Sequence, residues 1–261
     1  MKQIFVLLLT LSTNLIILAG WYPDSPDFIV NNIAYSIISE EDQTVIIKGV
    51  YQDESDLIIK ETVEYDGMVY TVTAIGYEGL VYCKNVEKIS FPNTISSIGE
   101  LAFNHCINLK TLEFPEKIDY ISRKICNDYS SLQSVTLPQN VKTVREGAFM
   151  GCTSLKTIIS LNPTPPSADL SSFAWNRFDP IITLYVPSES ISEYKKVEPW
   201  KYCNIKPLEE SGVESVVDAN EGYFRVFDLK GANILNTSDK SEIDNLSPGI
   251  YIINGNKTVV K

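Results

Sequence analysis

The chain has 261 residues, and its 33 acidic against 22 basic side chains give a formal net charge of −11 at pH 7. So acidic a surface repels phosphate backbones and anionic lipid headgroups, which disfavours nucleic acid and membrane surfaces as partners. The five cysteines are an odd number, so they cannot all pair within one chain.

Residues 1–20 have the order of features that is typical of a secretory signal peptide. A positive start at Met1–Lys2 is followed by a mainly apolar run from Ile4 to Ala19, and the small residue Gly20 ends it. The run is shorter than the ~20 apolar residues that span a bilayer. We therefore expect export to the medium or the outer cell surface, with no transmembrane span in the mature chain.

Residues 21–71 are predicted to form an N-terminal β cap. From position 28 to position 70 the chain alternates between strand-like and turn-like stretches, with turn signals at Asn31–Asn32 and Asp66–Gly67. Such a segment can cover the apolar end that a following repeat array would otherwise expose.

Residues 72–164 contain an internal repeat with a period of 23 residues and no insertion over four turns. Aliphatic residues begin the turns, a second apolar position follows three residues later, and a further apolar column ends each turn. These columns are Val72, Ile95, Ile118 and Val141; Ile75, Ile98, Ile121 and Val144; and Ile89, Leu112, Val135 and Ile158.

Each repeat contains a stretch like Leu109-x-x-Leu112-x-Phe114, whose alternating part predicts a short strand with one buried face. One turn buries too little apolar surface to fold alone, whereas turns stacked at strand spacing of ~4.8 Å join every column into a continuous stripe. The prolines at 92, 115 and 138 end the strands at one height. The predicted fold class is therefore α+β and strand-rich: a leucine-rich-repeat solenoid with a 23-residue period, a β cap and a small C-terminal β module.

The outward face of these strands is the candidate binding surface, because side chains on either side of a buried strand position point away from the core. This surface is mixed-polar and poor in aromatic residues, and an ordinary solvated face is the alternative interpretation. The predicted ligand-binding residues are Lys88, Ser90, Thr111, Glu113, Ser134, Thr136 and Thr157, and Ile159 is expected to point outward beside them.

Residues 165–208 are predicted to form a C-terminal cap, since Asn162-Pro-Thr-Pro-Pro interrupts the period. A strand is expected at 181–186 and a short helix at 188–196. Large side chains should supply the core of this cap, and they are Phe173, Trp175 and Phe178.

Residues 212–261 read as a separate small β module. Tyr223 begins a strand-and-turn pattern, and the last residues predict a hairpin around Asn254–Gly255.

Catalytic and metal-binding chemistry is not expected. His105 is the one histidine, and the repeat places it one turn from Asp128, but no serine or cysteine has a spacing that marks it as a nucleophile. No paired cysteine spacing suggests a metal site, and no cofactor is expected. A disulfide between Cys83 and Cys106, which occupy one column, is geometrically possible.

The unit from Ile95 to Pro115, with Leu109-x-x-Leu112-x-Phe114 at its end, resembles the BspA-like leucine-rich repeat of Bacteroidetes. The segment from Val226 (Val-Phe-Asp-Leu-Lys-Gly) and the Gly249-Ile-Tyr-Ile stretch are similar to sorting domains of the type IX secretion system. The first resemblance implies an exported, non-enzymatic binding or adhesion protein that recognises a host protein, a glycan or another bacterial surface. The alternative is an accessory of an extracellular glycan- or peptide-degrading system, or a weak hydrolase. The oligomeric state stays open.

Overall fold

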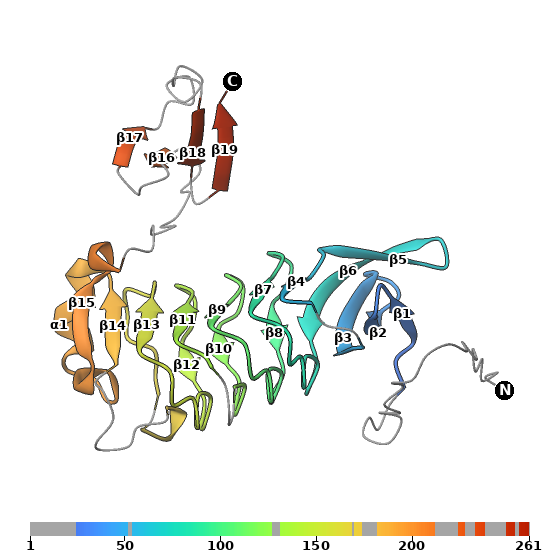
Figure 1. Cartoon of the computed structure of the whole chain (residues 1–261), viewed down its shortest axis with the longest axis horizontal. Helices are drawn as coiled ribbons and strands as arrows, with labels where there is room; N and C mark the ends of the chain where they lie inside the picture. The colour runs from blue at the N-terminus through green and yellow to red at the C-terminus, as the bar shows by residue number, and fades with distance from the viewer. Residues whose placement is uncertain are drawn as a thin grey trace.

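The computed structural model describes residues 25–51, 54–126, 131–168, 170–173 and 182–211, and beyond them the backbone of four further strands. The predicted signal peptide lies outside the described residues, as do Asp128, Trp175 and Phe178. The fold is a strand-rich solenoid that a β-sheet caps at its N-terminal end, as predicted (Figure 1).

The N-terminal cap is a rolled sheet in the order β1-β2-β3-β6-β5. Three rings pack together in it: Phe28 stacks on the buried Tyr35 with centroids 5.4 Å apart and on the exposed Tyr65 at 4.1 Å. The β5–β6 turn at Asp66–Gly67 has positive φ angles of 50° and 74°, which a tight hairpin requires. The strands are β1 (Phe28–Val30), β2 (Ile33–Ser39), β3 (Thr44–Val50), β5 (Thr62–Tyr65) and β6 (Met68–Ile75).

The cap and the repeats share strand β6. It pairs with β3 in the cap and also runs parallel to β8 (Ser97–Ile98), with Ala74 opposite Ser97 and Ile75 opposite Ile98. These partners are one repeat period apart, so the repeat register begins inside the cap. A continuous hydrogen-bonded sheet therefore fixes the first turn on the cap.

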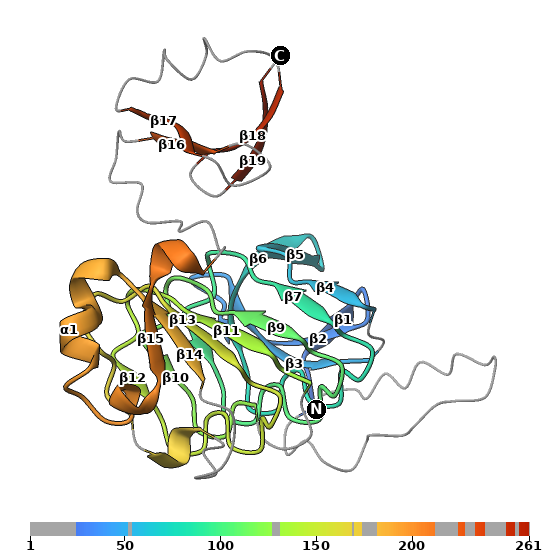
Figure 2. The same cartoon turned by 60° about the vertical axis from the view of Figure 1, so that its left-hand side comes forward.

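The main sheet of the solenoid is parallel and forms one long side of the coil (Figure 2). Its hydrogen-bonded order is β15-β14-β13-β11-β9, and the β4–β7 pair lies next in line, joined by the bond from Lys110 N–H to the Glu87 carbonyl at 3.2 Å. The strands are β4 (Asp56–Ile58), β7 (Lys88–Ser90), β9 (Thr111–Glu113), β11 (Ser134–Leu137), β13 (Thr157–Ser160), β14 (Thr183–Val186) and β15 (Asn204–Pro207).

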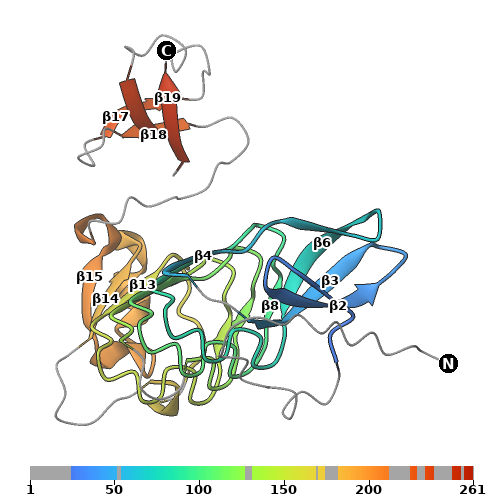
Figure 3. The same ribbon diagram turned by 45° about the vertical axis from the view of Figure 1, so that its right-hand side comes forward.

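The strand register confirms the predicted period. Leu112 lies opposite Val135, and Val135 lies opposite Ile158, so that each step to the next strand advances the chain by one period. All three side chains are no more than 1% exposed, so the column that the sequence predicts is a buried stripe. Figure 3 shows the turns stacked behind one another as successive coils.

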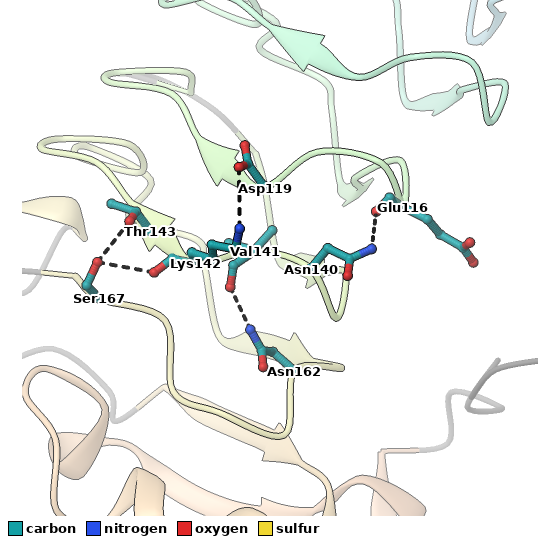
Figure 4. A network of polar contacts seen from close by, with 8 residues as sticks. All are labelled: Glu116, Asp119, Asn140, Val141, Lys142, Thr143, Asn162 and Ser167. Atoms are coloured by element: carbon teal, nitrogen blue, oxygen red, sulfur yellow. Dashed lines mark hydrogen bonds and ion pairs between the residues drawn. The ribbon is translucent and has the colours of Figure 1, made fainter.

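Polar bonds also join adjacent turns on the other side of the coil (Figure 4). There β10 (Tyr120–Ile121) pairs in parallel with β12 (Thr143–Val144). The Asn140 amide donates to the Glu116 carbonyl at 3.1 Å, and the Lys142 ammonium lies 3.9 Å from the Asp119 carboxylate. The buried Asn162 amide donates to the Val141 carbonyl at 2.6 Å, which satisfies a polar group inside the stack.

An aromatic stripe runs through the core along the stacking direction. Phe103 and Phe149 lie two turns apart, and Phe114 contacts both, at centroid distances of 6.5 Å and 6.3 Å. The turn between them has the small residue Cys126 in the phenylalanine column, so the Phe114 ring bridges the interval. Phe149 then stacks on Phe173 at 5.7 Å.

The parallel sheet continues into residues 183–207, beyond position 164 where the sequence predicts the end of the repeats. β14 pairs with β13 and β15 pairs with β14, both in parallel, so the solenoid has about six turns. The predicted strand at 181–186 is present as β14, and the predicted helix at 188–196 is the shorter α1 (Ile191–Tyr194). Single 3₁₀ turns complete this end: η1 (Leu170–Ser172), η2 (Ser188–Ser190), η3 (Trp200–Tyr202) and η4 (Leu208–Glu210).

The C-terminal end of the core is closed by Trp200 and Tyr194, both fully buried. The Trp200 indole N–H donates to the Pro166 carbonyl at 2.7 Å, and its ring meets Phe173 at 5.3 Å. The Tyr194 hydroxyl lies 2.7 Å from the Ser160 hydroxyl. Of the predicted cap aromatics, Phe173 is therefore confirmed as core.

The predicted C-terminal β module contains a four-stranded antiparallel sheet in the order β17-β16-β18-β19. β18 and β19 form the hairpin that the sequence predicts, with Ile253 opposite Asn256. The strands are β16 (Phe224–Phe227), β17 (Asn233–Thr237), β18 (Gly249–Ile253) and β19 (Asn256–Val260).

Replacement of one core leucine should destabilise the stack far more than replacement of its exposed neighbour. Leu112→Ala leaves a cavity in a column that is 1% exposed, and we expect it to lower the free energy of unfolding by about 2–5 kcal/mol. Thr111→Ala, on the exposed face of the same strand, should change it by less than about 0.5 kcal/mol. Urea unfolding followed by circular dichroism measures both values, and equal effects would contradict the buried register.

Candidate functional site

All seven predicted binding residues lie on the outward face of the main sheet. Lys88, Ser90, Thr111 and Glu113 are exposed on β7 and β9. Ser134, Thr136 and Thr157 are half-buried on β11 and β13.

The first outward column is a row of hydroxyl groups. Parallel pairing places Thr111 opposite Ser134, Ser134 opposite Thr157 and Thr157 opposite Thr183. Neighbouring strands lie about 4.8 Å apart, so four hydroxyl side chains follow one another at that spacing. Among the described residues none of the four makes a side-chain hydrogen bond, which leaves each hydroxyl able to donate and accept with a partner. We call these four residues the hydroxyl ladder.

The second outward column mixes charge and apolar surface. It runs from Glu113 through Thr136, Ile159 and Tyr185 to Lys206. Ile159 was predicted to point outward as an exposed residue, but it is only 3% exposed. The neighbouring strand supplies the reason: the bulky Tyr185 lies opposite Ile159 on β14, within reach of a cross-strand contact. The prediction of an exposed Ile159 is therefore wrong.

Sequence reasoning missed the part of this face that β14 and β15 supply, namely Thr183, Tyr185 and Lys206. A signal was present, because Leu184-Tyr185-Val186-Pro187 has the same alternation and closing proline as Val135-Thr-Leu-Pro138. A strict period leads from Ile158 to position 181, whereas the strand partner of Ile158 is Leu184. A search at a fixed spacing therefore passes over this turn.

The structure places His105 beside an aromatic ring. Its imidazole stacks on Tyr82 with centroids 4.6 Å apart and an interplanar angle of 1°. Both residues have positive φ angles, 62° and 61°, at the same position of successive turns. Within the described residues no group of three His, Cys, Asp or Glu side chains could hold a metal ion.

The possible disulfide between Cys83 and Cys106 is not formed, nor is any other among the five cysteines, all of which the structure describes. The Cys106 thiol instead donates to the Leu80 carbonyl at 3.1 Å, and the Cys152 thiol donates to the Cys126 carbonyl at 3.0 Å. A hydrogen bond with Cys152, together with burial, raises the pKa of the Cys126 thiol well above its usual value. These cysteines thus act as small apolar core residues.

The thiols should therefore be inert in the folded protein. The thiolate is the reactive form, and burial raises the pKa of Cys203, the most accessible of the five, to about 12. Protein purified without reductant should react slowly with Ellman's reagent at pH 8. After denaturation in guanidinium it should release five equivalents, and three equivalents would reveal one disulfide.

Several solved structures of bacterial leucine-rich repeat proteins are similar to parts of the chain. No functionally curated protein matches it. A solved leucine-rich repeat protein from Bacteroides ovatus is 25% identical, with 57% of this chain and 50% of that chain covered and a TM-score of 0.34. One from Bacteroides capillosus is 22% identical, with coverage of 51% and 96% and a TM-score of 0.45. The T. pallidum leucine rich repeat protein is 19% identical, with coverage of 51% and 70% and a TM-score of 0.41. The chain thus spans half the length of the first of these structures.

The repeats themselves identify the family. The model of the BspA type leucine rich repeat region matches residues 70–206 with six copies, which is more than half of the chain. In the described part of the structure no helix is both long enough and apolar enough to cross a membrane. Proteins built on these repeats are generally non-catalytic. The chain belongs to the BspA type leucine-rich-repeat family.

Proposed function

We propose that this protein is an exported binding or adhesion protein that recognises an extracellular protein or glycan through the outward face of its parallel sheet. The observation that carries the proposal is the hydroxyl ladder. Four side chains stand in register on successive strands, and none of them is engaged in a side-chain hydrogen bond among the described residues.

The chemistry of the ladder suits a partner with repeated polar groups. A hydroxyl both donates and accepts, so it can bond with sugar hydroxyls or with the amides of an extended peptide. Lys88 and Glu113 flank the ladder on β7 and β9 and are both exposed, so they offer charged contacts of either sign at its edge. Rigid strands hold all these groups, which lowers the entropic cost of binding.

Export and the domain arrangement belong to the same proposal. Residues 1–20 would direct export, residues 21–71 and 165–208 would cap the solenoid, and residues 212–261 would serve as a sorting module. The supporting observation is the similarity of the segments at Val226 and Gly249 to sorting domains, together with the separate sheet that these segments form.

A paired substitution on the ladder tests the binding surface. Thr111→Arg with Ser134→Glu places two long charged side chains on adjacent strands, where they obstruct a partner and should weaken binding at least about tenfold. Both positions face outward, so the fold should be unaffected. The measurement is binding of the purified protein to an array of matrix proteins and glycans, followed by titration of each hit.

The matched control makes the same two changes on the other side of the coil. Thr143→Arg with Ser167→Glu also joins positions on adjacent turns. It removes the hydrogen bond between those two hydroxyls, so circular dichroism checks that the variant is folded, and its binding should be unchanged. A ligand that binds the ladder variant as tightly as the unmodified protein would contradict the proposed surface. Absence of any ligand on a broad array would argue for an accessory role in an extracellular degrading system.

A further inference from the structure

A cleft of about 220 Å³ lies at the N-terminal end of the main sheet, away from the hydroxyl ladder. Strand β4 forms one wall, and the turn between β1 and β2 forms the other. Figure 2 shows β4 beside β7 at the end of the row of parallel strands. Its lining residues are Asn31, Asn32, Ile33, Tyr35, Glu54, Asp56, Leu57, Ile58 and Lys60.

The backbone of β4 is paired on one edge only. Lys88 N–H donates to the Ser55 carbonyl at 3.1 Å, and Ile59 N–H donates to the Ser90 carbonyl at 2.9 Å. Consecutive strand residues turn their backbone groups to opposite edges, so the N–H and C=O groups of Asp56 and Ile58 face away from β7. Within the described part of the chain these groups have no hydrogen-bond partner.

The edge strand at the opposite end of the same sheet, β15, is less able than β4 to accept an added strand. At β15, Asn204 N–H donates to the Ile182 carbonyl at 2.9 Å, so the groups of Ile205 and Pro207 face outward. Proline has no N–H, and its presence on an edge blocks strand addition. β4 contains no proline, and the side chain of Ile58, its last residue, is 66% exposed.

The charged residues that line the cleft favour a positively charged ligand. Glu54 and Asp56 stand against the single cation Lys60, and no ion pair joins these three side chains among the described contacts. The whole chain carries a net charge of −11, which adds to the attraction for a cation. Tyr51, whose N–H donates to the Asn32 carbonyl at 2.8 Å, adds a 58% exposed ring near the cleft.

The size of the cleft limits the kind of ligand. Pockets for whole small molecules measure roughly 300–1,000 Å³, so a volume of about 220 Å³ holds only one or two side chains. An open strand edge beside such a cleft is the arrangement used in β-strand addition, where main-chain bonds supply affinity and a pocket takes alternate side chains.

We propose that this cleft binds an extended peptide segment that adds as a strand to the free edge of β4 and places a basic side chain against Glu54 and Asp56. Ile58 provides the backbone N–H and C=O at the centre of the new pairing. This site is separate from the hydroxyl ladder and does not depend on it.

The test uses the full protein and a fluorescein-labelled peptide of alternating threonine and valine with one central lysine, followed by fluorescence anisotropy at low salt. The lysine peptide should bind at least about tenfold more tightly than the same peptide with a central glutamate. Ile58→Pro removes the N–H that faces the cleft and spares the bonds to β7, so it should weaken binding at least about tenfold. Ile58→Thr keeps that N–H and should bind within about threefold of the unmodified protein.

A peptide-side measurement keeps the test independent of the stability of Ile58→Pro. N-methylation of every second peptide residue removes the donors on one edge, and one of the two alternate methylation patterns should abolish binding while the other preserves it. Asp56→Asn should reduce the ratio between the affinity of the lysine peptide and that of the glutamate peptide. Equal binding of the two methylated peptides, or no binding of the lysine peptide at all, would overturn the proposal.

The ladder variant separates this site from the proposed function. Thr111→Arg with Ser134→Glu should bind the lysine peptide as the unmodified protein does, whatever it does to ligands of the sheet face. Loss of peptide binding in that variant would place the peptide on the sheet face and overturn the β4 site.

Discussion

Everything in this molecule depends on the stacking of parallel strands at one fixed spacing. A turn buries its apolar side chains only when its neighbours lie in register, because a slip of one residue would turn the strand's buried side chains outward. The Leu112, Val135 and Ile158 column shows the result. Surface ion pairs obey the same constraint, since Glu87 meets Lys110 at 2.6 Å one period away.

The aromatic stripe shows how the stack tolerates a departure from its repeat. Cys126 removes a ring from the phenylalanine column, and Phe114 contacts Phe103 and Phe149 on either side of it. Large rings adapt in this way because edge-to-face contacts are favourable over centroid distances of about 4.5–7 Å. The stripe ends at Trp200, so the same type of contact that fills the repeats also attaches the C-terminal end.

Much of the fold could be predicted because a strict period carries information in many positions at once. The buried columns, the strands that end at proline and the outward residues of β7 to β13 all follow from it. The strand at β14 was predicted, but not that β14 and β15 continue the solenoid, because the interval between Ile158 and its partner Leu184 is longer than the period while the three-dimensional register continues. An insertion in a solenoid lengthens a loop without changing the strand register. Only the backbone pairing therefore reveals that the next strand stays in line.

The candidate sites were predictable to different degrees for the same reason. The seven outward residues follow from strand alternation, whereas the burial of Ile159 depends on Tyr185, which lies beyond the last predicted turn. The cleft at β4 lies between segments from the cap and the sheet that share no sequence pattern, so neither wall alone indicates it. The period also places Tyr82 one turn from His105, but only the structure, in which both residues have positive φ angles, shows that their rings stack.

The difference between the two ends of the main sheet has a consequence for self-association. Copies can add head to tail without limit only when the two sheet edges that meet can both pair as strands. Open-ended addition of this kind produces fibres. Here Pro207 removes one N–H from the outward edge of β15, so this edge offers fewer donors to the free β4 edge of another copy. The proline thus disfavours head-to-tail pairing of the two sheet ends, while the β4 edge stays open.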